Sequence, residues 1–146
     1  MTIRLYFPKW KLLLHAAIWF AVVGPLIPAS LGLFNPVFLI AAWITGGLPA
    51  ALAGVFFAMG TNLLQVANPG HVMSRKQTRA LAAVLGALSG LLAVIPFWLF
   101  LGSQQSMFGL VWGSWLMPVL CVPSAAICGA LFATQFLPAD EAQTAV

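Results

Sequence analysis

The amino-acid sequence predicts an all-α, polytopic membrane protein, a bundle of four transmembrane helices made of two helical hairpins. Hydrophobic residues fill 62% of the 146 positions and charged residues only 5%, whereas a soluble domain carries about 25% charged residues. The apolar residues form four runs, each long enough for a span of ~20 residues. The charged residues lie between these runs or at their ends. The chain, residues 1–146, is therefore predicted to be a single transmembrane domain.

The first predicted span covers residues 12–34. It follows a lead, residues 1–10, whose three aromatic and two cationic side chains suit the headgroup zone of a bilayer. Gly24, Pro25 and Pro28 interrupt the second half of the span. Because proline lacks an amide donor, we expect a kink there.

A basic start followed by an apolar run is also typical of a secretory signal peptide. The small residues at Ser30 and Gly32 do not form the Ala-x-Ala pattern that cleavage requires. We therefore expect an uncleaved first span.

The second predicted span covers residues 36–65 and opens at Asn35-Pro36, where Asn caps the helix and Pro takes its first position. A helix of this length extends ~45 Å, which exceeds the ~30 Å hydrocarbon layer. Tilt, a kink at residues 46–49 or an end in the interface must absorb the excess. Small residues recur every four positions and form a stripe for close helix packing in lipid: Gly46, Ala50, Gly54 and Ala58.

A basic loop, residues 66–79, joins the two hairpins. Within it, Ser74 and Gln77 match the capping box S-x-x-Q, which predicts a third helix from Arg75. The third and fourth predicted spans cover residues 75–101 and 107–136. Each carries a further stripe of small residues: Ala82, Gly86 and Gly90 in the third span, and Ala125, Gly129 and Ala133 in the fourth.

The charges predict an orientation. The six cations lie at the amino end and in the basic loop, and the two acids lie in the carboxyl-terminal tail: Arg4, Lys9, Lys11, Arg75, Lys76 and Arg79; Asp140 and Glu141. Cytoplasmic segments of membrane proteins are enriched in Lys and Arg. We therefore expect a multi-pass protein of a bacterial-type cytoplasmic (inner) membrane with both termini in the cytoplasm. The net charge of +4 is explained by this orientation, so no nucleic-acid partner is expected.

A short internal similarity suggests a duplication of the hairpin. Residues 50–58 and 125–133 are identical at five of nine positions, and each segment follows a proline-containing stretch. Parallel repeats of this kind occur in transporters, although segments rich in Ala and Gly also match by chance.

The spans offer little reactive chemistry. No Asp, Glu, Lys or Arg lies in the interior of a predicted span, so a proton-coupled carrier or a charged pore lacks its usual residues. His15 lies in the first span and His71 in the basic loop, and two such histidines make a poor metal or haem site. Cys121 and Cys128 are too far apart along one helix for a disulfide. We expect no catalysis, no metal and no cofactor, an interfacial His15 that donates to a carbonyl or headgroup, and cysteines that serve packing.

The tryptophans predict either aromatic belts at the two interfaces, which is the favoured interpretation, or a ligand-stacking set. Any pocket is expected where proline-broken helices free backbone carbonyls: between Trp43, Pro49, Pro118 and Pro123.

The first functional hypothesis is a non-catalytic membrane protein that acts through helix–helix contacts with a membrane partner, as an accessory subunit, assembly factor or immunity-type protein. It rests on the missing chemistry and on small-residue stripes that exceed what four short helices need for their own packing. The alternative is a small homodimeric transporter or channel that moves a neutral or lipophilic solute past proline-kinked helices. The expected partners are the lipid bilayer and a membrane protein or a second copy of the chain.

Overall fold

The computed structural model describes residues 9–31, 36–67, 73–101 and 116–136. This part of the chain is helical throughout except for short breaks, as the sequence predicts. Five helices are present in it: α1 (Lys9–Val23), α2 (Leu26–Leu31), α3 (Pro36–Ala67), α4 (Arg75–Leu101) and α6 (Leu116–Phe136).

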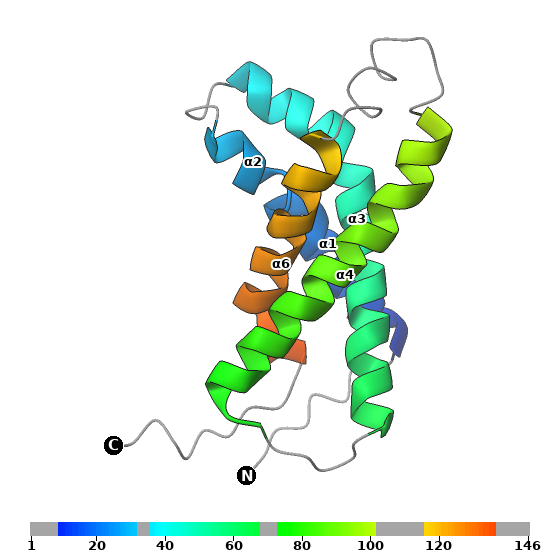
Figure 1. Ribbon diagram of the computed structural model, residues 1–146, viewed down its shortest axis with the longest axis vertical. Coiled ribbons are helices and arrows are strands. Elements are labelled where there is room, and N and C mark those ends of the chain that lie inside the picture. The colour runs from blue at the N-terminus through cyan, green and yellow to red at the C-terminus, as the bar shows by residue number, and fades with distance from the viewer. Residues whose placement is uncertain (1–8, 32–35, 68–72, 102–115, 137–146) are drawn as a thin grey trace.

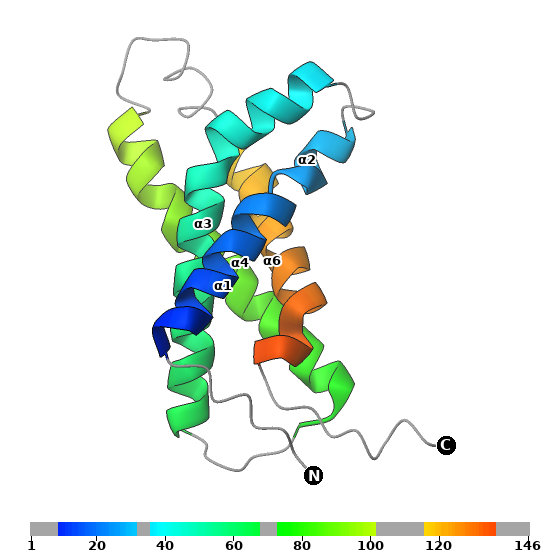
Figure 2. The ribbon, with the colours of Figure 1, turned by 180° about the vertical axis from the view of Figure 1, so that it is seen from behind.

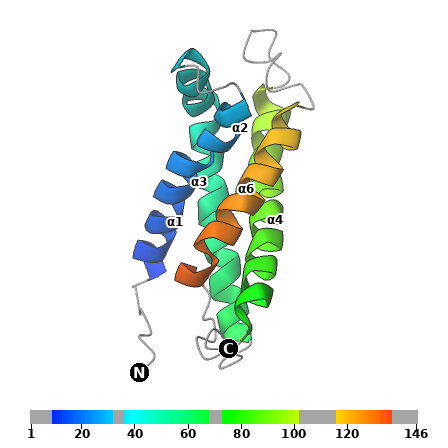
Figure 3. The ribbon, with the colours of Figure 1, turned by 90° about the vertical axis from the view of Figure 1, so that its left-hand side faces the viewer.

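The long helices run alternately up and down. Figures 1 and 2 show that α1 begins, α3 ends, α4 begins and α6 ends at one end of the bundle. α1 packs mainly on α3, α4 packs mainly on α6, and the two pairs meet chiefly along α3 and α4 (Figure 3). These pairs contain the same segments as the two predicted hairpins.

Three segments are long and apolar enough to cross a membrane: Trp10–Ser30, Leu39–Ala67 and Arg75–Leu99. A fourth apolar segment, Pro118–Ala133, is shorter. Parts of the predicted spans and loops, including the predicted helix cap at Asn35, lie outside the described residues, namely 32–35, 68–72 and 102–115, as do the two ends of the chain, 1–8 and 137–146.

The expected kink in the first span is a full interruption of the helix. The N–H of Gly24 donates to the carbonyl of Phe20 at 2.8 Å and closes α1, and the N–H of Ala29 donates to the carbonyl of Pro25 at 3.2 Å at the start of α2. Pro25 has no N–H with which to continue the first ladder. The segment predicted as one bent helix therefore forms two helices, α1 and α2.

The helix α3 is 32 residues long and continues through Pro49, which gives it a length of ~48 Å. In Figures 1 and 2 its amino-terminal part tilts away from the axis of the remainder and lies next to α2. Glycines at positions 46 and 47 and the missing N–H of Pro49 weaken the helix in this region. Tilt and bend are thus both present, as the length of the segment requires.

The capping box at the start of α4 is confirmed. The N–H of Ser74 donates to Oε1 of Gln77 at 3.2 Å, and the N–H of Gln77 donates to Oγ of Ser74 at 3.4 Å. This reciprocal pair satisfies two amides that a helix start leaves without partners, and α4 accordingly begins at Arg75.

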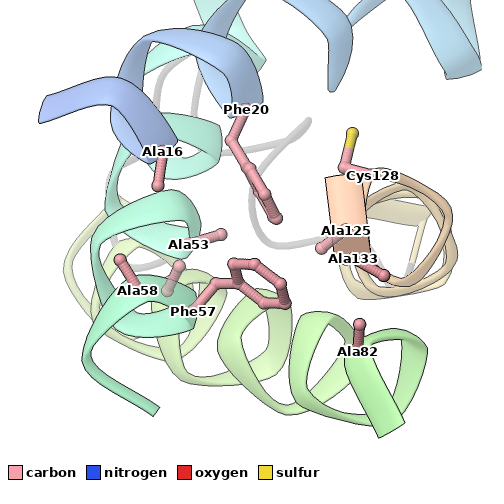
Figure 4. Close-up of a cluster of buried hydrophobic side chains, with 10 residues drawn as sticks. Ala16, Phe20, Ala53, Phe57, Ala58, Ala82, Ala125, Cys128 and Ala133 are labelled. Carbon is pink, nitrogen blue, oxygen red and sulfur yellow. The ribbon is translucent and has the colours of Figure 1, made fainter. Parts of the chain in front are cut away.

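The core of the bundle is built from small residues around two aromatic rings. Phe20 of α1 and Phe57 of α3 are buried and meet with ring centroids 5.2 Å apart (Figure 4). Most of the other buried hydrophobic residues are alanines, whereas the large hydrophobic side chains that are exposed are chiefly Leu, Ile, Val and Trp. A water-soluble monomer rarely carries apolar surface of this extent.

Candidate functional site

The stripe of small residues on α3 (Gly46, Ala50, Gly54 and Ala58; the α3 stripe) brings α3 into backbone contact with α1. A methyl group built on Gly54 would overlap the carbonyl group of Ala16 and would lie 2.9 Å from Cα of Ala17. Ala16 and Ala58 are fully buried on the two sides of this contact. Only glycine lets the two backbones approach this closely.

Contact along the same stripe becomes looser toward its amino end. A Cβ built on Gly24, at the end of α1, would lie 3.1 Å from Cβ of Ala50. At Gly46 a built Cβ would meet only Cγ of Pro25, at an ordinary van der Waals distance of 3.9 Å. The stripe is thus tightly packed at Gly54 and open at Gly46.

The small-residue stripes of α4 (Ala82, Gly86 and Gly90) and α6 (Ala125, Gly129 and Ala133) pack against each other. A methyl group on Gly86 would overlap the carbonyl of Ala125, and one on Gly129 would overlap the carbonyl of Ala82. A Cβ on Gly90 would lie 2.7 Å from Cβ of Ala125. The last stripe residue of α6, Ala133, is fully buried (Figure 4).

These contacts change the basis of the partner hypothesis. The sequence suggested that the stripes exceed the internal needs of the bundle, but the structure places Gly54, Gly86 and Gly129 in contacts inside the chain. A partner would therefore have to bind a surface other than the stripes.

One glycine faces away from these contacts. Gly47 is the only described glycine at which a built Cβ has no heavy atom within 4 Å. On the same face of α3, Val37, Ile40, Ile44 and Leu48 have exposed fractions of 71%, 59%, 67% and 64%. We refer to these five residues as the α3 outer face.

A cavity of about 110 Å³ lies between the two helix pairs, beside the break between α1 and α2. Of the four residues at which the sequence predicts a pocket, Pro49 lines this cavity, whereas Trp43, Pro118 and Pro123 are not part of its described lining. The sequence reasoning placed α6 at the pocket but named its prolines, whereas Leu120 and Cys121 line the cavity, and it missed the contribution of α4. The lining includes Phe20, Pro25, Pro28, Gly46, Pro49, Val94, Leu120 and Cys121.

Trp43 has a structural role at the break. Its indole N–H donates to the carbonyl of Val22 at 3.3 Å. In an unbroken helix this carbonyl would accept from Leu26, but the chain leaves the helix between these two residues at Gly24-Pro25. The side chain of Trp43 thus supplies a donor where the backbone ladder is interrupted.

His15 accepts a hydrogen bond from Trp19. The indole N–H of Trp19 donates to Nε2 of His15 at 2.9 Å, and the two rings lie edge to face with centroids 6.0 Å apart. Trp19 also contacts the ring of Phe132 on α6 at 4.9 Å between centroids. His15 is therefore part of an aromatic contact between α1 and α6, and the other histidine, His71, lies outside the described residues.

The two cysteines occupy different surroundings and are both free thiols. Cys128 is fully buried in the core, whereas Cys121 is half-buried and lines the cavity. Within the described ranges, no three residues among His, Cys, Asp and Glu lie close enough together to hold a metal ion.

The cations of the described chain gather at one end of the bundle. Lys11 lies near the start of α1, and Arg75, Lys76 and Arg79 lie in the first turns of α4, all with exposed side chains. Figure 1 places both helix starts at the same end. Two segments that are distant in the sequence thus present positive charge on one side.

No family model, curated protein or solved structure matches the chain. The functional conclusions therefore rest on its own residues and geometry.

We predict that Gly54→Leu destabilises the fold, because the new side chain must displace the Ala16 backbone. Overpacking of this kind costs about 1–3 kcal/mol or more. Gly47→Leu makes the same chemical change where space is open, and His15→Ala removes an exposed hydrogen bond to Trp19, so both should stay within about 0.5 kcal/mol of the parent protein. Unfolding free energies from SDS titration in mixed micelles test this ranking, and an order with His15→Ala most damaging would contradict it.

We predict that Trp43→Phe lowers the unfolding free energy by about 0.5–1.5 kcal/mol, the net contribution of one hydrogen bond. The change keeps an aromatic ring but removes the donor to the Val22 carbonyl. Trp10→Phe, at an exposed position near the start of α1, serves as the control with little effect. Equal stability of the two variants would show that the bond at the helix break is unimportant.

Proposed function

We propose that this protein is a non-catalytic integral membrane protein of a bacterial-type cytoplasmic membrane that acts through lateral contacts with a membrane-protein partner. The distribution of side chains supports insertion into lipid. Alanines and glycines occupy the helix contacts while Leu, Ile and Val cover the outside. Helices in lipid associate through such small residues because lipid tails are as apolar as the side chains that face them.

The position of the cations supports a cytoplasmic location for both ends of the chain. The exposed Lys11 and Arg75 lie where α1 and α4 begin, at the end of the bundle where α6 also finishes (Figure 2). Lys and Arg are retained on the cytoplasmic side of a membrane. The proposed topology has four crossings, and the predicted span 107–136, to which α6 belongs, is the fourth.

We predict that alkaline phosphatase fused to either terminus is inactive and that green fluorescent protein fused there is fluorescent. A phosphatase fusion after Gln104, in the uncharged turn between the third and fourth predicted spans, should be active and serves as the positive control. Phosphatase activity at either terminus would overturn the topology.

The α3 outer face is the observation that carries the partner proposal. It combines four exposed aliphatic side chains with Gly47, a position at which nothing covers the backbone within 4 Å of a built Cβ. A neighbouring helix could approach the backbone at Gly47 and pack between Ile44 and Leu48. The tightly packed glycines, such as Gly54 and Gly86, are already used in contacts inside the chain. A partner of this kind fits an accessory subunit, an assembly factor or an immunity-type protein.

We predict that a photo-crosslinking amino acid at Ile44 gives one defined product with a second membrane protein in intact membranes. The same probe at Leu88, which is exposed on α4, should give none, and Gly47→Leu should abolish the Ile44 product by blocking close approach. Equal products from Ile44 and Leu88, or the uncrosslinked chain alone at both positions, would contradict the proposal.

The cavity favours a second candidate function, a small homodimeric transporter or channel for a neutral or lipophilic solute. It lies beside the proline-broken segments of α2 and α3, and broken helices line solute sites in many transporters. Uptake of a solute into liposomes that contain the purified protein tests this function directly. A crosslink from Ile44 to a second copy of the chain would support the dimer that it requires.

A further inference from the structure

We propose that the cavity between the two helix pairs is a binding site for one small, uncharged, apolar molecule about the size of a benzene ring. A role of this site in transport would rest on the second candidate function, the transporter. Binding at the site does not depend on the α3 outer face. Its volume is about 110 Å³. An engineered apolar cavity of ~150 Å³ in another protein stays free of water and binds benzene or xenon.

The hydroxyl groups in the lining are turned back to their own helices. Oγ1 of Thr45 donates to the carbonyl of Ala41 at 2.7 Å, and Oγ of Ser124 donates to the carbonyl of Leu120 at 2.6 Å. Both donors are therefore occupied, which is the usual arrangement for Ser and Thr within helices. A polar solute would find neither hydroxyl available as a donor.

Apart from the thiol of Cys121, the other side chains of the lining are hydrocarbon. Phe20, Val94 and Leu120 contribute large apolar side chains from α1, α4 and α6. None of the described lining residues carries a charge, and the described cations lie at the end of the bundle where α1 and α4 begin. An ion or a zwitterion would lose its hydration without a compensating partner. The chemistry of the lining therefore selects an apolar occupant.

The cavity exists because the helices are held together on one side of it and interrupted on the other. Gly54 and Gly86 bring the backbones of each pair into contact. Beside the cavity, Gly24 and Pro25 end α1, and Pro49 lies within α3. Small residues at the cavity wall, such as Gly46, leave the space between these elements unfilled.

Two adjacent glycines provide a matched test. Gly46 lines the cavity, and a built Cβ there meets nothing closer than 3.9 Å, so the side chain of Gly46→Leu can enter the cavity without a backbone clash. Gly47 is not part of the described lining and faces open space. Gly47→Leu therefore makes the same change in the same helix but leaves the cavity empty.

The experiment measures binding of fluorobenzene to the full-length protein in detergent by ¹⁹F NMR titration. We expect saturable binding to the parent protein and to Gly47→Leu, and at least a tenfold loss with Gly46→Leu. The anion 4-fluorobenzoate should not bind to the parent protein. Ala42→Leu, a second substitution in the lining, should reproduce the loss, so that a folding defect in one variant does not decide the outcome.

Unsaturable partition of fluorobenzene, equal binding to the parent protein and Gly46→Leu, or comparable binding of 4-fluorobenzoate would overturn the site. Because this assay uses purified protein in detergent, it requires neither flux nor a partner. Binding without liposome uptake would support the site and reject transport, whereas loss of the site would leave the crosslinking result at Ile44 unaffected.

Discussion

The arrangement of this bundle depends on direct contact between helix backbones at glycine. At Gly54 the backbone of α3 lies against the carbonyl of Ala16, and at Gly86 and Gly129 the backbones of α4 and α6 lie against each other. These contacts fix each pair of helices at a distance that no larger residue permits. They also determine where the pairs can separate, and therefore where the cavity lies.

The same constraint explains what covers the outside. If the helix contacts are made by Gly and Ala, the large aliphatic residues must point elsewhere, and many of them are exposed on α1, α3 and α4. In water each Å² of such surface would cost about 25 cal/mol. In lipid it costs nothing, which is why the packing and the proposed membrane location support each other.

Local patterns predicted the local features. The start of α4 after Ser74 and the interruption at Pro25 follow from residues that lie close together in the sequence. Contacts between distant segments were harder to predict. The four-residue spacing predicts the same close packing at Gly46 and Gly54. Of these two, only Gly54 contacts the backbone of another helix. Likewise, the prolines indicated pocket walls on α3 and α6, but of these only Pro49 lines the cavity, and nothing in the sequence indicated Val94 of α4. The missing information is which helix faces which, and at what depth.

The adjacent residues Gly46 and Gly47 show how one helix can serve two roles. Successive residues differ in direction by ~100° around a helix, so Gly46 borders the cavity while Gly47 belongs to the outer face. A ligand at the first position and a partner at the second would contact adjacent sides of the same glycine-containing segment. A partner that straightened or tilted this part of α3 would change the width of the cavity, because Pro49 and Gly46 form its wall. Coupling of this kind would require the two surfaces to share one element with two positions, and what they share is the glycine-containing part of α3 next to the break at Pro25.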